Sequence, residues 1–92
     1  SLNNARTRAK VAGFKSAASS LVAAWVIECD SGGITTTTHQ DLSITVPSSC
    51  DAFNAGTSNG SATPSSSGQY NGITCTATLS VTGASFSGTD CP

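Results

Sequence analysis

The stretch LNNARTRAKVAGFKSAASSLVAAWVIEC, Leu2 to Cys29, decides the fold of this chain. Its larger apolar residues recur at steps of three, four and one, the spacing that gathers side chains on one face of a helix with about 3.6 residues per turn. These residues are Val11, Phe14, Ala18, Leu21, Val22, Trp25 and Cys29. We therefore expect one helix over residues 2–29 that buries this face, closed by Gly32 and Gly33 in a left-handed conformation.

A helix of this length exceeds the width of a small domain. At about 1.5 Å per residue it would span about 42 Å, so one end is expected to project. The stretch from Leu2 to Lys10 is mostly polar and offers only Leu2, Ala5 and Ala9 as apolar side chains. We expect this first part to project, and the part from Phe14 to Cys29 to be buried.

Length and cysteine content indicate one small domain, residues 1–92, held by covalent bonds. Its 92 residues include only three Phe, one Tyr and one Trp, so the hydrophobic core is small. The four cysteines show none of the close spacings of a zinc site. They favour two disulfides formed in an oxidising compartment.

The charges are segregated along the chain, although the net charge is only −1. Every basic residue lies in the first fifteen positions and every acidic residue lies beyond them. The basic residues are Arg6, Arg8, Lys10 and Lys15, and the acidic residues are Glu28, Asp30, Asp41, Asp51 and Asp90. A helical wheel places the cations on two nearly opposite sides, so a solvated helix is favoured and DNA binding is only weakly supported.

After the helix, serine and threonine dominate and the apolar period falls to two, which is typical of strands. We expect strands over residues 34–40, 42–46 and 73–82, with a return strand over 84–91 after a turn at Gly83. Residues 48–71 read as a long irregular loop. The predicted fold class is α+β: helix 1–29 packed on a small antiparallel sheet of three to four strands within the β-rich part, residues 30–92.

The proposed hairpin also favours one disulfide pairing. Cys75 and Cys91 each lie eight residues from Gly83, so folding about that turn places them opposite one another. This favours a Cys75–Cys91 bridge and leaves Cys29 to pair with Cys50. Four cysteines permit three pairings, so the other two stay open.

No motif in the sequence indicates catalysis, a cofactor or a metal. His39, Asp41 and the many serines could be assembled into a hydrolytic triad, but no Gly-x-Ser-x-Gly turn accompanies them, and a surface histidine is favoured. Asp90 could join an irregular calcium site only as a minor alternative. We expect no enzymatic activity, no stretch that spans a membrane and no signal-peptide pattern.

The helix LNNARTRAKVAGFKSAASSL, followed by a Ser/Thr-rich β head with disulfides, resembles the soluble part of a type IV pilin or pilin-like protein. In sequence the resemblance rests mainly on Asn4 to Lys15. It implies that a hydrophobic half-helix, absent here, precedes Ser1 and contains the assembly residues of the family. It also implies a C-terminal disulfide in the head, which matches Cys75–Cys91, and an exposed variable surface over residues 48–71.

The resemblance further implies a filament subunit for adhesion, twitching motility or DNA uptake. Such a subunit is anchored in the bacterial inner membrane before assembly into a surface pilus, where other pilin subunits are its partners. The soluble fragment itself is expected to be monomeric. Opposite charges on neighbouring subunits are candidate contacts. They are Arg6, Arg8 and Lys10 on one side, and Glu28, Asp30 and Asp51 on the other.

Two other functions stay open. A type II secretion pseudopilin would share the helix but build a short periplasmic structure. A free secreted binding or adhesin domain, stapled by its disulfides, would begin its helix at an Asn3 or Asn4 cap and lack a hydrophobic extension.

Overall fold

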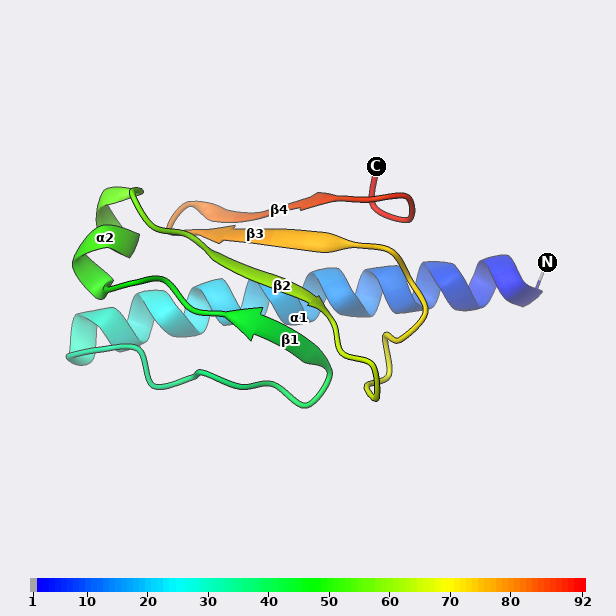
Figure 1. Cartoon of the computed structure of the whole chain (residues 1–92), viewed down its shortest axis with the longest axis horizontal. Helices are drawn as coiled ribbons and strands as arrows, with labels where there is room; N and C mark the ends of the chain where they lie inside the picture. The colour runs from blue at the N-terminus through cyan, green and yellow to red at the C-terminus, as the bar shows by residue number, and fades with distance from the viewer. Residues whose placement is uncertain (1) are drawn as a thin grey trace.

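The computed structural model describes residues 2–92 and shows one long helix lying along one face of a four-stranded antiparallel sheet (Figure 1). The strands lie in the sequential order β1-β2-β3-β4. The elements are α1 (Leu2–Ser31), β1 (Leu42–Thr45), α2 (Cys50–Ala55), β2 (Gly60–Pro64), β3 (Thr76–Ser80) and β4 (Gly83–Ser87). The predicted α+β class, a long N-terminal helix on a small antiparallel sheet, is confirmed.

The predicted apolar face of α1 forms the core of the domain. Its buried residues are Phe14, Ala18, Leu21, Val22 and Trp25. Val11 and Cys29 at the ends of the same face are half-buried. The helix continues two residues beyond the predicted end and closes at Gly32, whose φ is +139°, with the Gly33 amide donating to the Glu28 carbonyl at 3.0 Å. Glycine suits this closure because other residues rarely adopt a positive φ.

The sheet presents two chemically different faces, because successive side chains of a strand point to opposite sides. The buried side chains toward α1 are Leu42, Ala62, Ala77 and Leu79. The side chains on the other face all bear hydroxyl groups. The strand register aligns one row of them across all four strands: Thr45, Ser61, Thr78 and Ser85. This outer face is therefore uncharged and faces water.

Residues 48–71 are not the irregular loop that composition predicts, because they contain α2 and the inner strand β2. The hydroxyl oxygen of Ser49 caps α2 by accepting the Ala52 amide at 3.1 Å, and Gly56 closes it with φ +77°. The ring of Trp25 lies against β2 at Gly60. A Cβ on Gly60 would overlap that ring.

Residues 34–40 form no strand beyond a single bridge between His39 and Leu42, so this prediction was wrong. The backbone amides of Thr35 and Thr36 bind the Glu28 carboxylate instead of a neighbouring strand. The segment is therefore attached to the end of α1 rather than to the sheet.

The predicted C-terminal hairpin is present, but it turns at Val81 and Thr82 rather than at Gly83, which is the first residue of β4 and pairs with Ser80. Both of its strands are shorter than expected. Thr74 is taken out of strand pairing because its amide donates to the Asp90 carboxylate at 2.6 Å and its carbonyl accepts the Asp90 amide at 3.0 Å. These bonds turn the chain back after β4.

By length and composition alone, helix α1 is long and apolar enough to cross a membrane. The expectation that no stretch of the sequence could span a membrane was therefore wrong. The many alanine and valine residues of α1 raise the mean hydropathy on every side of the helix. One side is nevertheless the core of the domain, as described above.

Candidate assembly surface

The first two turns of α1 extend beyond the sheet (Figure 1). We call residues 2–9 the projecting segment. All of them are exposed except Thr7, which is half-exposed, and Leu2 retains 68% of its accessible surface. Coverage of the helix begins near Lys10 and Gly13, where the ammonium of Lys10 donates to the Asn71 carbonyl at 2.7 Å and the ring of Tyr70 lies against Gly13. The predicted projection of the N-terminal end is thus confirmed.

The outward face of α1 carries a second stripe that the sequence reading missed. Its members recur at steps of three and four, so they share one face of the helix, roughly opposite the buried one. We call it the outward stripe: Leu2, Ala5, Ala9, Ala12, Ser16, Ser20, Ala23 and Ile27. All eight residues are exposed, and none is charged. The signal was present in the spacing, but small residues do not stand out as a stripe.

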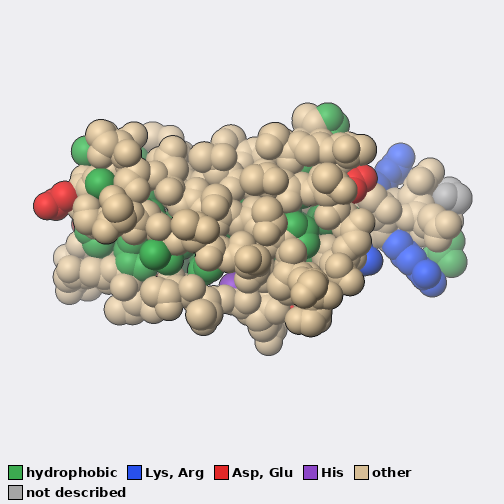
Figure 2. All heavy atoms as spheres, viewed as in Figure 1, with side chains coloured by type: hydrophobic (Ala, Val, Ile, Leu, Met, Phe, Trp, Pro, Cys, Tyr) green, Lys and Arg blue, Asp and Glu red, His purple; other side chains and the backbone are tan. Residues whose placement is uncertain are grey.

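The cations of the helix differ in what they contact. Arg6 and Arg8 are exposed and make no hydrogen bond or ion pair within the described chain. Lys10 is already bonded to Asn71, and the ammonium of Lys15 lies 5.4 Å from the centroid of the Phe86 ring. Figure 2 shows the Lys and Arg side chains gathered at the projecting end, one acidic side chain at the opposite tip and another near the base of the projection.

The opposite end of α1 is tied to α2 by a disulfide between Cys29 and Cys50, whose Cα atoms are 5.4 Å apart. A second disulfide joins Cys75 to Cys91, and these are the two pairs that the hairpin symmetry favours. Asp30 and Asp51 each follow a cysteine of the first bridge, so the bridge brings both to the same end. Both are exposed.

Glu28 differs from these two aspartates because its carboxylate is fully used inside the chain. It accepts the Thr35 and Thr36 amides at 2.7 and 2.9 Å, and the Thr36 hydroxyl at 2.6 Å. The Thr36 hydroxyl and these amides lower the pKa of Glu28 to about 2. The indole of Trp25 donates to the Thr36 carbonyl at 2.8 Å, so the same segment is held twice. The acids left free for contacts at this end are Asp30 and Asp51.

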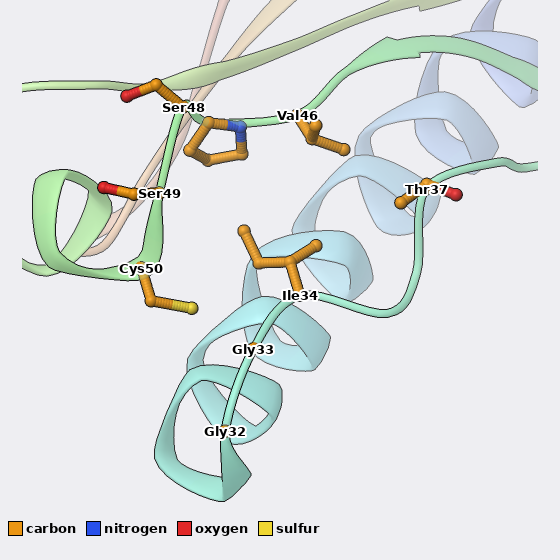
Figure 3. Close-up of a pocket in the computed structure, with 9 residues that line it drawn as sticks. Gly32, Gly33, Ile34, Thr37, Val46, Ser48, Ser49 and Cys50 are labelled. Carbon is orange, nitrogen blue, oxygen red and sulfur yellow. The ribbon is translucent and has the colours of Figure 1, made fainter.

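A shallow groove of about 350 Å³ lies between the segment after α1 and the connection from β1 to α2 (Figure 3). Ile34, Val46 and Pro47 give it an apolar lining. In Figure 3 the side chain of Ile34 points toward Val46, whereas the hydroxyls of Ser48 and Ser49 point away. Gly32 and Cys50 also line the groove, and they lie two residues after Asp30 and one residue before Asp51 in the sequence.

His39 and Asp41 form a structural turn. The Nδ1 atom of His39 accepts the Asp41 amide at 3.0 Å, and the Asp41 carboxylate accepts the amide and the side-chain amide of Gln69 at 3.1 and 3.0 Å. The pKa of Asp41 is lowered, chiefly by these bonds from Gln69. Asp41 is only 8% exposed and holds the loop after β2 against β1. No sequence pattern pointed to its partner Gln69.

Metal ligands do not gather in this structure. Within residues 2–92, no three His, Cys, Asp or Glu side chains lie close enough together to hold an ion. The Asp90 carboxylate, considered above for calcium, accepts the Thr74 amide and so fixes the C-terminal turn.

Comparison with known proteins found no match, whether to a family model, to a curated protein or to a solved structure. The arrangement of a long N-terminal helix on a four-stranded antiparallel sheet is compatible with a pilin-like α+β fold. The function must therefore be argued from the surfaces described above.

Proposed function

We propose that this chain is a structural subunit of a type IV pilus or a closely similar surface filament. The observation that carries the proposal is the outward stripe, which runs uncharged and exposed along α1 from Leu2 to Ile27. A helix that is apolar on one face needs one partner, and a helix that is apolar on two faces needs a second. The sheet covers the buried face, and neighbouring subunits would cover the other.

The composition of the outward stripe supports helix packing. Alanine and serine allow helix backbones to approach closely, as at the interfaces between helices in membranes. Leu2 and Ile27, the large residues at its two ends, are 68% and 66% exposed. Large apolar side chains left in water at both ends of one stripe favour burial in an assembly.

The projecting segment supports the same role. Its eight residues form about two turns of α1 that extend beyond the sheet. If α1 continued into a hydrophobic segment buried by other subunits, these turns would connect that segment to the domain. The uncharged outer face of the sheet would then form the water-facing surface of the filament.

The disulfides agree with this location. Two bridges in one small domain indicate an oxidising, extracytoplasmic environment. We further propose that the chain passes through the bacterial inner membrane and reaches the cell surface in the assembled pilus. A type II secretion pseudopilin would use the same helix surfaces in a shorter periplasmic structure.

A free secreted binding domain is the second candidate, and the groove between Ile34 and Val46 favours it. Its volume of about 350 Å³ is at the lower end of the roughly 300–1,000 Å³ of small-molecule sites. Under this alternative, the outward stripe would face water in the working protein.

The proposal is tested by deleting the gene in its native organism and complementing it with either the natural protein or Ala12→Arg. Filaments sheared from the cells are then counted by immunogold electron microscopy. The natural protein should label filaments along their length, and Ala12→Arg should remove them because a long cation interrupts the outward stripe. Thr78→Arg on the outer sheet face is the matched control and should assemble. Unlabelled filaments, or normal assembly of Ala12→Arg, would contradict the proposal.

A further inference from the structure

The two ends of the molecule carry opposite charges that cannot meet within one copy. Arg6 lies 24 residues before Asp30 on the same helix, which separates them by about 36 Å. Charges this far apart are screened from each other, because the Debye length is about 8 Å at physiological ionic strength. Only another molecule can bring Arg6 or Arg8 beside Asp30 or Asp51.

The exposed apolar residues divide between the same two ends. Among the described residues, the large hydrophobic side chains left exposed are Leu2, Ile27 and Val46. Leu2 begins the projecting segment, whereas Val46 lines the groove and Ile27 lies in the last two turns of α1. Leu2 and Arg6 are four residues apart and therefore share one side of the helix. The projecting segment thus presents an apolar side chain and a cation together. The opposite end has a groove with apolar walls, and the exposed Asp30 and Asp51 lie close in sequence to its lining residues Gly32 and Cys50.

We propose that the groove beside Asp30 and Asp51 receives the projecting segment of a second copy of this chain. Leu2 of the incoming copy lies against Ile34 and Val46, and Arg6 lies beside the two aspartates. This contact deepens the proposed function, on which it rests, by naming the partner surface along the filament axis.

The geometry decides what such a contact builds. The two surfaces differ and lie at opposite ends of a molecule that measures 46 × 23 × 16 Å, so the contact is heterologous. A heterologous contact leaves one free surface at each end and propagates into a filament unless its rotation closes a ring. A pair of copies related by a two-fold axis would not use it.

Disulfide trapping with two versions of the whole chain tests the contact. One version carries Leu2→Cys, the other Val46→Cys with a mass tag, and an equal mixture is oxidised and separated under non-reducing conditions. We expect the mixed dimer to exceed both homodimers well beyond its statistical share. Replacing Val46→Cys with Thr78→Cys, on the outer sheet face, should give only the statistical share. A statistical yield for Leu2 with Val46 would overturn the proposal.

Charge reversal provides the second measurement. Asp30→Lys with Asp51→Lys should lower the mixed-dimer yield several-fold, and adding Arg6→Glu with Arg8→Glu to the Leu2→Cys version should restore it. Lys15→Glu makes the same kind of change outside the projecting segment and should leave the yield unchanged. The contact would be overturned if the mixed-dimer yield did not fall when the two aspartates are replaced, or if it did not recover after the charges are exchanged.

These outcomes are separable from those of the proposed function. Trapping in a chain that never labels surface filaments would retain the contact and refute the filament role. Labelled filaments without trapping would refute the contact alone.

Discussion

The two ends of α1 are stabilised in opposite ways. The C-terminal end is held from within by the Cys29–Cys50 bridge, by the Glu28 carboxylate and by the indole of Trp25. The projecting segment has no such support and displays Arg6 and Arg8 to solvent. The difference teaches that residues 10–92 supply most of the stability of the domain, whereas residues 2–9 are the part that the proposed contact with another copy would use.

The largest loss of stability is expected at the supported end, for Trp25→Ala. Trp25 is fully buried, and its ring lies edge-to-face with the Phe53 ring at a centroid distance of 5.9 Å. Its indole N–H also donates a hydrogen bond to the Thr36 carbonyl. Truncating a buried aromatic side chain costs about 3–5 kcal/mol, and chemical denaturation would measure it. Ser20→Ala on the outward stripe is the control, with an expected change within about 0.5 kcal/mol. If the two variants lost similar free energy of unfolding, the buried face of α1 would contribute no more to stability than the outward stripe, which would contradict the account.

The second largest loss of stability is expected on removal of the Cys29–Cys50 bridge. Replacing both cysteines by serine opens a loop with a sequence separation of 21 residues. The chain-entropy model gives a loss of about 3 kcal/mol in the free energy of unfolding. We also expect faster amide exchange in residues 30–37, because the end of α1 that holds them is no longer tied to α2. The same change at Cys75 and Cys91 should instead loosen the C-terminal hairpin. Unchanged exchange in residues 30–37 would contradict the role given to this bridge.

The contribution of Glu28 to the stability of the C-terminal end of α1 should depend on pH. The pKa of Glu28 is about 2 in the folded chain against an ordinary value of 4.5, so folding favours the charged carboxylate. The stabilisation is fully present above about pH 4.5 and is lost as the pH falls toward about 2. Glu28→Gln should therefore lower stability at neutral pH and flatten this part of the stability profile. A slope for Glu28→Gln equal to that of the natural chain would contradict the role of Glu28.

The smallest effect on stability is expected in the projecting segment. Arg6→Glu and Leu2→Ser should each change the free energy of unfolding by no more than about 0.5 kcal/mol, because neither side chain packs within its own copy. Thermal unfolding of the isolated chain would measure this. Both variants should nevertheless reduce filament assembly. A marked loss of stability would show that the segment belongs to the fold of its own copy.

The parts of the fold that the sequence predicted correctly depend on local periodicity. The spacing of Phe14 to Trp25 predicted the buried face of α1, and the alternation from Cys75 to Val81 predicted β3 and its inner side. In both cases neighbours in sequence also determine the geometry. The predicted Cys75–Cys91 pairing is correct, but the symmetry about Gly83 is not its cause, because the register pairs Thr76 with Ser87 and brings Gly88, not Cys91, opposite Cys75.

The parts that were missed depend on distant partners. The glycine at position 60 of β2 is required by the ring of Trp25, and no local pattern records that contact. Residues 34–40 look like a strand but bind Glu28 at the end of α1. Helix α2 could have been found from its Ser49 cap and Gly56 closure. The outward stripe also has helical spacing in the sequence, but its members are mostly alanine and serine, which do not mark an apolar face.

The most direct test of the filament account is mass spectrometry of the native protein, purified from the organism that makes it and read through its N-terminus. The account predicts that α1 is preceded by a hydrophobic segment of at least about 20 residues, long enough to be buried among other subunits. It also predicts that this form is present in filaments sheared from the cell surface. A native chain that begins at or near Ser1 would contradict the account and favour a secreted binding domain.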